Sequence, residues 1–229
     1  MSKSDNSFFP DERGTSSLLL VEGPDDKEVI GAILQVHEMT PGFAVSVEEG
    51  VKNLKQAFSS RLKSTNVLRK LWVMADADGD CNAKWQMLRD CMLANGSYDI
   101  TPKTPLPKQG AVFYPKDDHG VTVGIWIMPD NESPGMIEDF ITLLIKNDDT
   151  LIGHAVSKVE ALDNERESHP NLFRQVHASK AVVHTWLAWQ DKPGCSLGTA
   201  ILKRKLDFSS SLCTDFLAWL GALQPDSRE

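Results

Sequence analysis

Cysteine is scarce in this chain of 229 residues, and its four copies stand far apart, at Cys81, Cys91, Cys195 and Cys213. None has the Cys-x-x-Cys spacing, so the sequence predicts neither a zinc knuckle nor a disulfide framework. No apolar run approaches the roughly 20 residues that cross a membrane, and the polar start lacks the form of a signal peptide. These absences predict reduced thiols in a cytoplasmic protein.

Positive charge is also in short supply. Lys and Arg number 24 against 32 Asp and Glu, which gives a formal net charge of −8 at pH 7. This balance argues against a protein that holds nucleic acid on a broad basic surface. It does not exclude a nuclease, because an acidic metal site itself contributes negative charge. The basic groups in 52–70 and 203–205 are explained more simply as solvated helix faces.

The most informative stretch is an apolar run at 71–75 that breaks into carboxylates at alternate positions, Asp76, Asp78 and Asp80. A continuous apolar run of this length indicates a strand buried on both faces, as in a parallel sheet covered by helices. Ligands bind beyond the carboxyl ends of such strands. Three carboxylates this close repel one another unless protons or a cation intervene, and hard oxygen ligands favour Mg²⁺ or Mn²⁺. The stretch therefore predicts a divalent metal site.

Other interpretations of this stretch are open. A calcium loop that starts at Asp76 fails, because it needs glycine at Cys81 and glutamate at Met87. The haloacid-dehalogenase phosphatases carry Asp-x-Asp-Gly-Thr after a strand, which fits except at Asp80. A solvated acidic loop after a core strand is the plainest alternative. A further acid contributed by another part of the chain would favour the interpretation as a metal site.

Strands and helices alternate before this stretch: strand 17–21, a helix from Pro24, strand 42–47 and helix 51–63. Alternation of this kind implies right-handed crossovers and a parallel sheet. Glu22 follows the first strand as Asp76 follows the third. If these two strands are neighbours, with the second strand outside, their ends lie about 5 Å apart. Glu22 then joins the aspartates in one cluster.

Two segments together resemble a Toprim domain, the catalytic module shared by topoisomerases, bacterial primases and OLD-family nucleases. They are Val21-Glu22-Gly23-Pro24-Asp25-Asp26 and Met74-Ala75-Asp76-Ala77-Asp78-Gly79-Asp80. The resemblance covers roughly residues 16–95. It implies a three-layer α/β/α fold with a mainly parallel central sheet and a Mg²⁺ or Mn²⁺ cofactor. The family's Asp-x-Asp-x-Asp metal motif falls on Asp76, Asp78 and Asp80. The family's glutamate falls on Glu22, as general acid/base or bridging ligand.

The resemblance implies phosphodiester chemistry on nucleic acid. A topoisomerase needs a nucleophilic tyrosine on a further domain, and only Tyr98 and Tyr114 occur here. A primase would carry a zinc-binding module. Stand-alone Toprim-like bacterial proteins related to OLD-family nucleases remain, with a role in phage defence or DNA repair. By analogy, the expected partners are nucleic acid, a separate ATPase and a further copy of the chain. The alternatives are a non-catalytic module that binds a partner protein, and a small Asp-x-Asp phosphatase.

Further acids are candidate outer or second-metal ligands. Asp25 and Asp26 suit the positive N-terminus of the helix that begins at Pro24. Asp130 follows the second strand of a hairpin predicted at 111–114 and 121–128, at the sheet edge. Ser133 is expected to cap the next helix, with Glu138 and Asp139 one turn inside. For Asp130, Glu138 and Asp139, turn and helix-surface positions are the simpler explanation.

The last third of the chain is predicted to be helical. We expect three units: a flexible arm at 1–15, the Toprim-like domain at 16–149, and a helical extension at 150–229 packed on the core. Helices are predicted at 82–94, 178–190, 196–205 and 211–223. Tryptophans such as Trp186, Trp189 and Trp219 are expected in the core. Lys180 shares a helix face with His184, and it is a candidate catalytic residue that could reach a phosphate.

Overall fold

The computed structural model describes residues 8–64 and 67–225, and a single five-stranded sheet lies at its centre. The strands are β1 (Ser17–Val21), β2 (Ala44–Val47), β3 (Lys70–Asp76), β4 (Ala111–Phe113) and β5 (Thr122–Met128). Their order is β2-β1-β3-β5-β4, and all pairs are parallel except β4 with β5. The predicted parallel sheet, the adjacency of β1 and β3, and the edge hairpin are confirmed.

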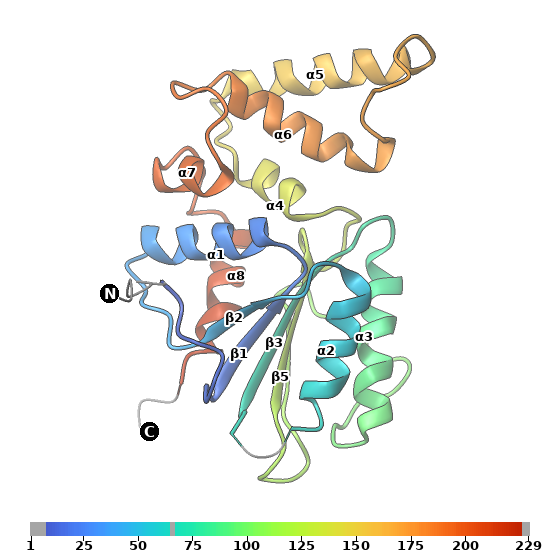
Figure 1. Ribbon diagram of the computed structural model, residues 1–229, viewed down its shortest axis with the longest axis vertical. Coiled ribbons are helices and arrows are strands. Elements are labelled where there is room, and N and C mark those ends of the chain that lie inside the picture. Colours follow the sequence, from blue (N-terminus) through green and yellow to red (C-terminus); the bar gives the residue numbers. More distant parts are fainter. Residues whose placement is uncertain (1–7, 65–66, 226–229) are drawn as a thin grey trace, which may run out of the picture.

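Helices cover both faces of this sheet (Figure 1). On one face lie α2 (Val51–Arg61) and α3 (Cys81–Asn95). On the other lie α1 (Pro24–Val36) and α8 (Ser211–Gly221). The three-layer α/β/α fold predicted from the sequence is therefore confirmed. Within the described ranges, no helix has both the length and the apolar character needed to cross a membrane.

Alternate side chains of each strand enter two different hydrophobic cores. Leu18 and Leu20 pack with α2 and α3, while Leu19 and Val21 pack on the opposite face. This is why the strands are apolar without interruption, since each buries both of its faces. At Gly124 on β5 a Cβ atom would lie 2.3 Å from the Trp72 ring. The Trp72 indole can therefore occupy its position only because Gly124 has no side chain.

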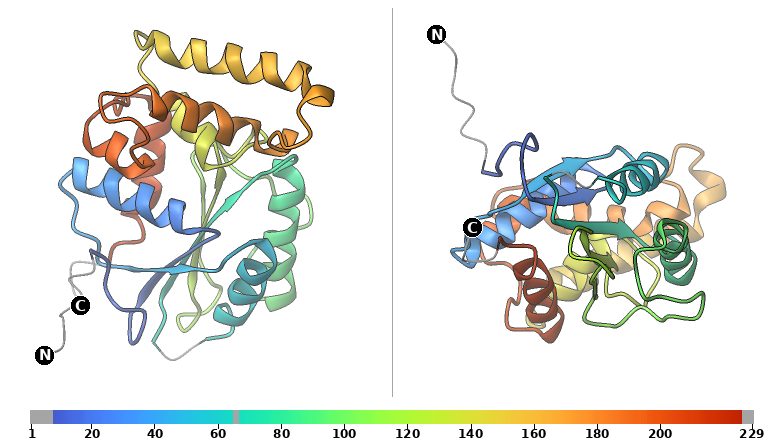
Figure 2. Two further views of the ribbon diagram at one scale, coloured as in Figure 1. Left: turned by 45° about the horizontal axis from the view of Figure 1, so that its top comes forward. Right: turned by 90° about the horizontal axis from the view of Figure 1, so that it is seen from below.

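The remaining helices extend the fold beyond the carboxyl ends of the strands (Figures 1 and 2). They are α4 (Ile137–Leu144), α5 (Thr150–Asn164), α6 (Ala178–Ala188) and α7 (Leu197–Leu202), with short 3-10 turns at Arg166–Ser168 and Gln175–His177. The pair α5 and α6 pack on each other, and α6 also contacts α4. As a result α6 lies over the edge of the sheet where the predicted acidic cluster falls.

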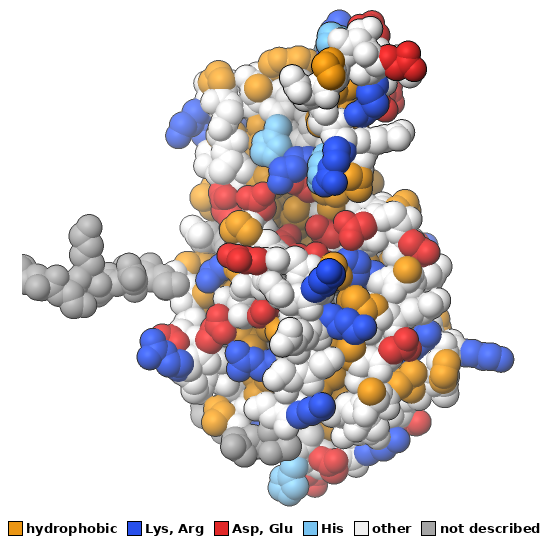
Figure 3. All heavy atoms as spheres, turned by 45° about the vertical axis from the view of Figure 1, so that its right-hand side comes forward, with side chains coloured by type: hydrophobic (Ala, Val, Ile, Leu, Met, Phe, Trp, Pro, Cys, Tyr) orange, Lys and Arg blue, Asp and Glu red, His pale blue; other side chains and the backbone are white. Residues whose placement is uncertain are grey.

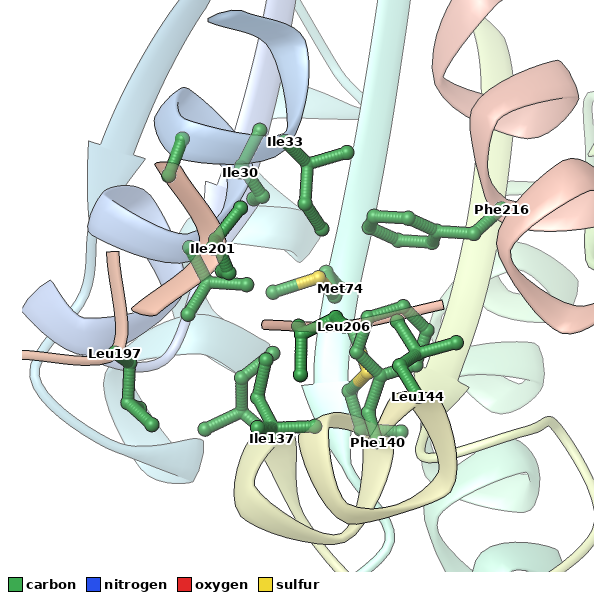
Figure 4. Close-up of a cluster of buried hydrophobic side chains, with 14 of the residues drawn as sticks. Ile30, Ile33, Met74, Ile137, Phe140, Leu144, Leu197, Ile201, Leu206 and Phe216 are labelled. Carbon is green, nitrogen blue, oxygen red and sulfur yellow. The ribbon is translucent and has the colours of Figure 1, made fainter. Parts of the chain in front are cut away.

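The helical extension shares a core with the sheet. Figure 4 shows Ile33 of α1, Met74 of β3, Phe140 of α4, Ile201 of α7 and Phe216 of α8 meeting in one cluster, and each is at most 1% exposed. This core continues to the last helix, where the Trp72 indole N–H donates to the Trp219 carbonyl at 2.9 Å. Helices α4, α7 and α8 thus share the core of the α/β unit, while α5 packs on α6.

The expectation that Trp189 lies in the core was wrong, and one residue of the predicted N-terminal arm is buried. Residues 1–7 of the predicted arm lie outside the described residues, but Phe9 is buried and its ring lies 6.0 Å from that of Phe43. Phe9 therefore anchors the described part of the arm on the core, although residues 10–14 are exposed. Trp186 and Trp219 are buried as expected, whereas Trp189 is 42% exposed. It falls at the C-cap of α6, past the helix face that packs inward.

Helix α4 begins later than expected. Ser133 does not cap it, because its N–H and hydroxyl both bind the Asp130 carboxylate, at 2.7 and 2.8 Å. Gly135 follows with φ +140°, a conformation outside any helix. The helix therefore starts at Ile137, and Glu138 and Asp139 occupy its first turn rather than its second.

Because the helical extension shares a core with the sheet, shortening a buried side chain of α8 should destabilise the whole protein cooperatively. Phe216→Ala should lower the free energy of unfolding by about 3–5 kcal/mol, because a fully buried ring is replaced by a cavity. Leu202→Ala, at a half-exposed position on α7, should cost within about 0.5 kcal/mol. Urea unfolding monitored by fluorescence and circular dichroism should give one coincident transition. Two separated transitions would show that the extension folds independently.

Candidate functional site

A hollow of about 320 Å³ lies beyond the carboxyl ends of β1 and β3. Six carboxyl groups line it: Glu22, Asp25, Asp26, Asp76, Asp78 and Glu138. His177 and Lys180, from the start of α6, complete its wall. Figure 3 shows acidic side chains gathered at the waist of the molecule, with basic and histidine side chains on the lobe above it. Five separate stretches of sequence, one of them represented by Gly50 alone, therefore converge on one acidic site.

Glu22 and Asp76 are connected directly, because β1 and β3 are neighbours in the sheet. The Asp76 backbone N–H donates to Glu22 Oε1 at 3.2 Å. The Asp76 carboxylate in turn accepts the Ile137 N–H at 3.1 Å through Oδ1. Ile137 is the first residue of α4, so Asp76 sits at the positive end of that helix. The predicted pairing of the two motifs is present in the fold.

Asp26 and Glu138 lie in the first turns of α1 and α4. Both are buried, with 5% and 2% exposure. Asp26 Oδ2 accepts the Gly23 N–H at 2.8 Å, which caps the start of α1. Helix N-termini favour negative charge, so the two helices help to hold carboxylates in a site where burial opposes them.

Asp78 reaches the site through an unusual backbone conformation. Its φ of +53° is left-handed, a region that Asp and Asn tolerate better than most residues. Backbone hydrogen bonds in both directions pair it with Gly135, at 2.8 and 2.9 Å, in the loop before α4. Its carboxylate, about half exposed, lies 3.1 Å from the ammonium of Lys84.

Two lysines bridge the acids in pairs. The buried Lys84 ammonium, on α3, contacts Glu22 at 3.2 Å as well as Asp78. Lys180 contacts Asp25 and Glu138, each at 3.4 Å. Burial lowers the pKa of Lys180, but the charges of Glu138 and Asp25 outweigh it and raise the pKa above its usual value. Two ammonium groups therefore face six carboxyl groups.

The excess negative charge changes the protonation of the most buried acids. Burial, followed by the charges of Asp26, Glu22, Glu138 and Asp78, raises the pKa of Asp76 to about 9. Burial likewise raises the pKa of Asp26 to about 7, although the hydrogen bond from Gly23 opposes the shift. Without a further cation, the cluster thus retains protons at neutral pH.

The oxygen chemistry of the cluster fits a hard divalent cation. Among the described residues, the contacts of Glu22 all fall on Oε1, those of Asp76 on Oδ1 and those of Asp78 on Oδ2. Within the part of the chain that the structure describes, Glu22, Asp76 and Asp78 each keep a second carboxylate oxygen without a protein partner. In the positions that the structure records, no three His, Cys, Asp or Glu residues within 8–64 and 67–225 already form a metal-binding group. Lys84 would compete with such a cation for Glu22 and Asp78.

The structure gives three of the candidate acids structural duties outside the hollow. Asp80, proposed as a metal ligand, caps α3 by accepting the Ala83 N–H at 3.1 Å. Asp139 caps α4 by accepting the Met136 N–H at 2.8 Å. Asp130 holds the turn at Ser133, and these hydrogen bonds outweigh burial and lower its pKa. None of the three lines the acidic hollow.

Sequence reasoning missed Lys84 and His177. A signal for Lys84 was available, because it lies one turn before Leu88 and two turns before Met92 on α3. All three are buried, so a lysine interrupts an otherwise apolar helical stripe. A buried lysine needs a carboxylate partner, and the nearby motif offers several. His177 gave no comparable signal, since it lies in a short turn before α6.

Residues 16–224 match the model of a family described as a protein of unknown function, DUF3226. The chain belongs to this family. The match spans every residue that lines the acidic hollow, from Glu22 to Lys180, and it includes both the α/β unit and most of the helical extension. Comparisons with curated proteins and with solved structures gave no match.

The raised pKa of Asp76 predicts a stability that falls with rising pH when divalent cations are removed. Between pH 4 and 9 the folded protein keeps a proton on Asp76 that the unfolded chain releases, so unfolding becomes more favourable as pH rises. One such group contributes a slope of at most about 1.4 kcal/mol per pH unit. Asp76→Asn should reduce the slope while still accepting the Ile137 N–H.

Urea unfolding in EDTA across this pH range measures the slope. Asp90→Asn, at an exposed position on α3, is the matched control and should keep the parent slope. If Asp76→Asn also keeps it, Asp76 is already ionised in the cation-free protein.

Proposed function

We propose that this protein hydrolyses phosphodiester bonds in nucleic acid with the help of Mg²⁺ or Mn²⁺. The observation that carries the proposal is the convergence of Glu22, Asp76 and Asp78 on one hollow, each with a carboxylate oxygen to spare. The pairing of these residues is also what makes the sequence resemble a Toprim domain. A carboxylate cluster that retains protons for want of cations is suited to binding a divalent ion.

In this proposal Asp76 and Asp78 hold the metal and Glu22 bridges to it or acts as the base. Asp26 and Glu138 lie close enough for their negative charges to raise the pKa of Asp76. In this proposal they are supporting acids and not metal ligands. When bound, Mg²⁺ would polarise the phosphoryl group and activate the attacking water. Asp80, Asp130 and Asp139 take no part in this proposal, because none of them lines the acidic hollow.

Glu22 is the residue best placed to accept a proton. Its Oε1 is held by the Asp76 N–H and by Lys84, which fixes the carboxylate and leaves Oε2 for the water. In hydrolysis the water oxygen forms a bond to phosphorus as the bond to the leaving oxygen breaks. Glu22 takes the proton from the water, and a proton must reach the leaving oxygen.

The positions of Lys180 and His177 favour a polymeric substrate. Both also line an adjoining hollow of about 400 Å³ along α6, together with Phe173, Ala181 and His184. A strand could therefore extend from the acidic site along α6, with the ammonium and imidazole groups near its phosphates. Basic groups of this kind position the backbone without reading sequence. They also place positive charge locally on a chain that is acidic overall.

Glu22→Gln tests the catalytic role. The variant keeps an oxygen to accept the Asp76 N–H but cannot take a proton, so Mn²⁺-dependent cleavage of plasmid or single-stranded DNA or RNA should fall about 10²–10⁴-fold. Asp90→Asn should cleave as the parent does. The melting temperature of Glu22→Gln should stay near that of the parent, which separates lost chemistry from lost folding. Cleavage at the parent rate would remove Glu22 from the mechanism.

A non-catalytic role as a partner-binding module is favoured by one observation. Lys84 bridges Glu22 and Asp78, so these two acids already have a cation within the chain. If the purified protein cleaves neither DNA nor RNA in Mg²⁺ or Mn²⁺, this alternative gains. The Asp-x-Asp phosphatase would instead be revealed by metal-dependent hydrolysis of p-nitrophenyl phosphate. A cytoplasmic location, a separate ATPase and self-association belong to the nuclease proposal by analogy.

A further inference from the structure

A second hollow, of about 590 Å³, lies between α3 and the proline-rich loop that follows it. It shares no lining residue with the acidic hollow. Trp85 and Arg89 of α3 form one wall, and Lys103 and Thr104 form another. Asn131, just beyond the carboxyl end of β5, closes it on the side of the sheet. Its volume lies within the range of small-molecule sites.

Arg89 is the unusual residue of this hollow. Its side chain belongs to a residue only 9% exposed, and its Nε is buried without a partner. Across residues 8–64 and 67–225, Arg89 has no hydrogen bond and no carboxylate within ion-pairing distance. The guanidinium lies over the Trp85 ring, 5.9 Å from its centroid. Buried arginines are normally paired, because an uncompensated buried charge is costly.

The surroundings hold Arg89 in this position. The Trp85 ring stacks on Phe113, at 5.8 Å between centroids and 10° between planes. The Trp85 indole N–H donates to the Thr104 carbonyl at 2.8 Å, which ties the loop to α3. Glu132, the acid that lines the hollow, forms an ion pair with Lys108. The hollow is thus pre-formed, and its own carboxylate is engaged elsewhere.

We propose that this hollow is a phosphate-binding site in which Arg89 supplies the principal contact. A guanidinium presents several N–H donors in a planar fork that matches the oxygens of a phosphate. Lys103 adds a second positive charge at the mouth. The phosphate belongs either to a free nucleotide or to a nucleic-acid strand, and the two sources share this chemistry. The site does not depend on the proposed nuclease activity, since it lies apart from the carboxylates.

Titration calorimetry in EDTA tests the site, because without divalent cations the six carboxyl groups of the acidic hollow oppose phosphate binding there. The ligands are inorganic phosphate, adenosine monophosphate and a short single-stranded oligonucleotide. The parent should bind at least one of them. Arg89→Met should weaken that binding about 10- to 100-fold, the effect of losing charge-assisted hydrogen bonds. Arg61→Met, at an exposed position on α2, should bind as the parent does.

Melting temperatures without ligand separate a binding role from a structural one. Methionine of similar length removes a buried unpaired charge, so Arg89→Met should melt at or above the parent temperature. Mononucleotide binding without oligonucleotide binding would identify a free nucleotide as the ligand, and tighter oligonucleotide binding would identify a strand. The proposal is overturned if none of the three ligands binds the parent, if Arg89→Met binds them unchanged, or if Arg89→Met melts well below the parent.

Discussion

Mutual repulsion among carboxylates at the carboxyl edge of β1 and β3 is the constraint on which the site depends. Two neighbouring parallel strands bring Glu22 and Asp76 together, and the N-termini of α1 and α4 add Asp26 and Glu138. Burial makes this repulsion stronger, as the raised pKa of Asp76 indicates. A fold governed by stability alone would not gather these groups, so the cost points to a function that uses their charge.

Hydrogen bonds and ion pairs within the chain reduce the electrostatic cost of gathering these carboxylates. Backbone N–H groups of Gly23 and Ile137 each donate to one acid, and the ammonium groups of Lys84 and Lys180 each bridge two. Lys180 can do so only because α6 is held above the sheet by the core that α4, α7 and α8 share with β3. The helical extension is thus part of the site, and the shared core is what positions it.

The parts of the site that follow from strand order could be predicted from the sequence. Alternating strands and helices predict that Glu22 and Asp76 meet, because the carboxyl ends of parallel strands share one edge. Local hydrogen-bond competition was harder to foresee. Asp80 and Asp139 are engaged by helix caps, and the start of α4 moved because Ser133 is held by Asp130.

Long-range placement was beyond sequence reasoning for a different reason. Lys180 was a candidate from its helix face, but its distance from Glu138 depends on how α6 packs over the sheet. The apolar stripe of α3 marks Lys84 as a buried lysine with acids nearby, but its contact with Glu22, 62 residues away in the chain, depends on how α3 packs against the sheet. Such contacts join elements that are far apart in the chain, and only tertiary packing determines them.

Calorimetric titration of the parent with Mn²⁺ at pH 7, in two buffers of different ionisation enthalpy, tests the account most directly. The difference in heat between the buffers counts the protons released on binding. With the pKa of Asp76 at about 9 and that of Asp26 at about 7, the cation-free cluster holds protons that a divalent cation must displace. The account predicts binding with proton release that Asp76→Asn diminishes. An absence of Mn²⁺ binding, or binding without proton release, would contradict it.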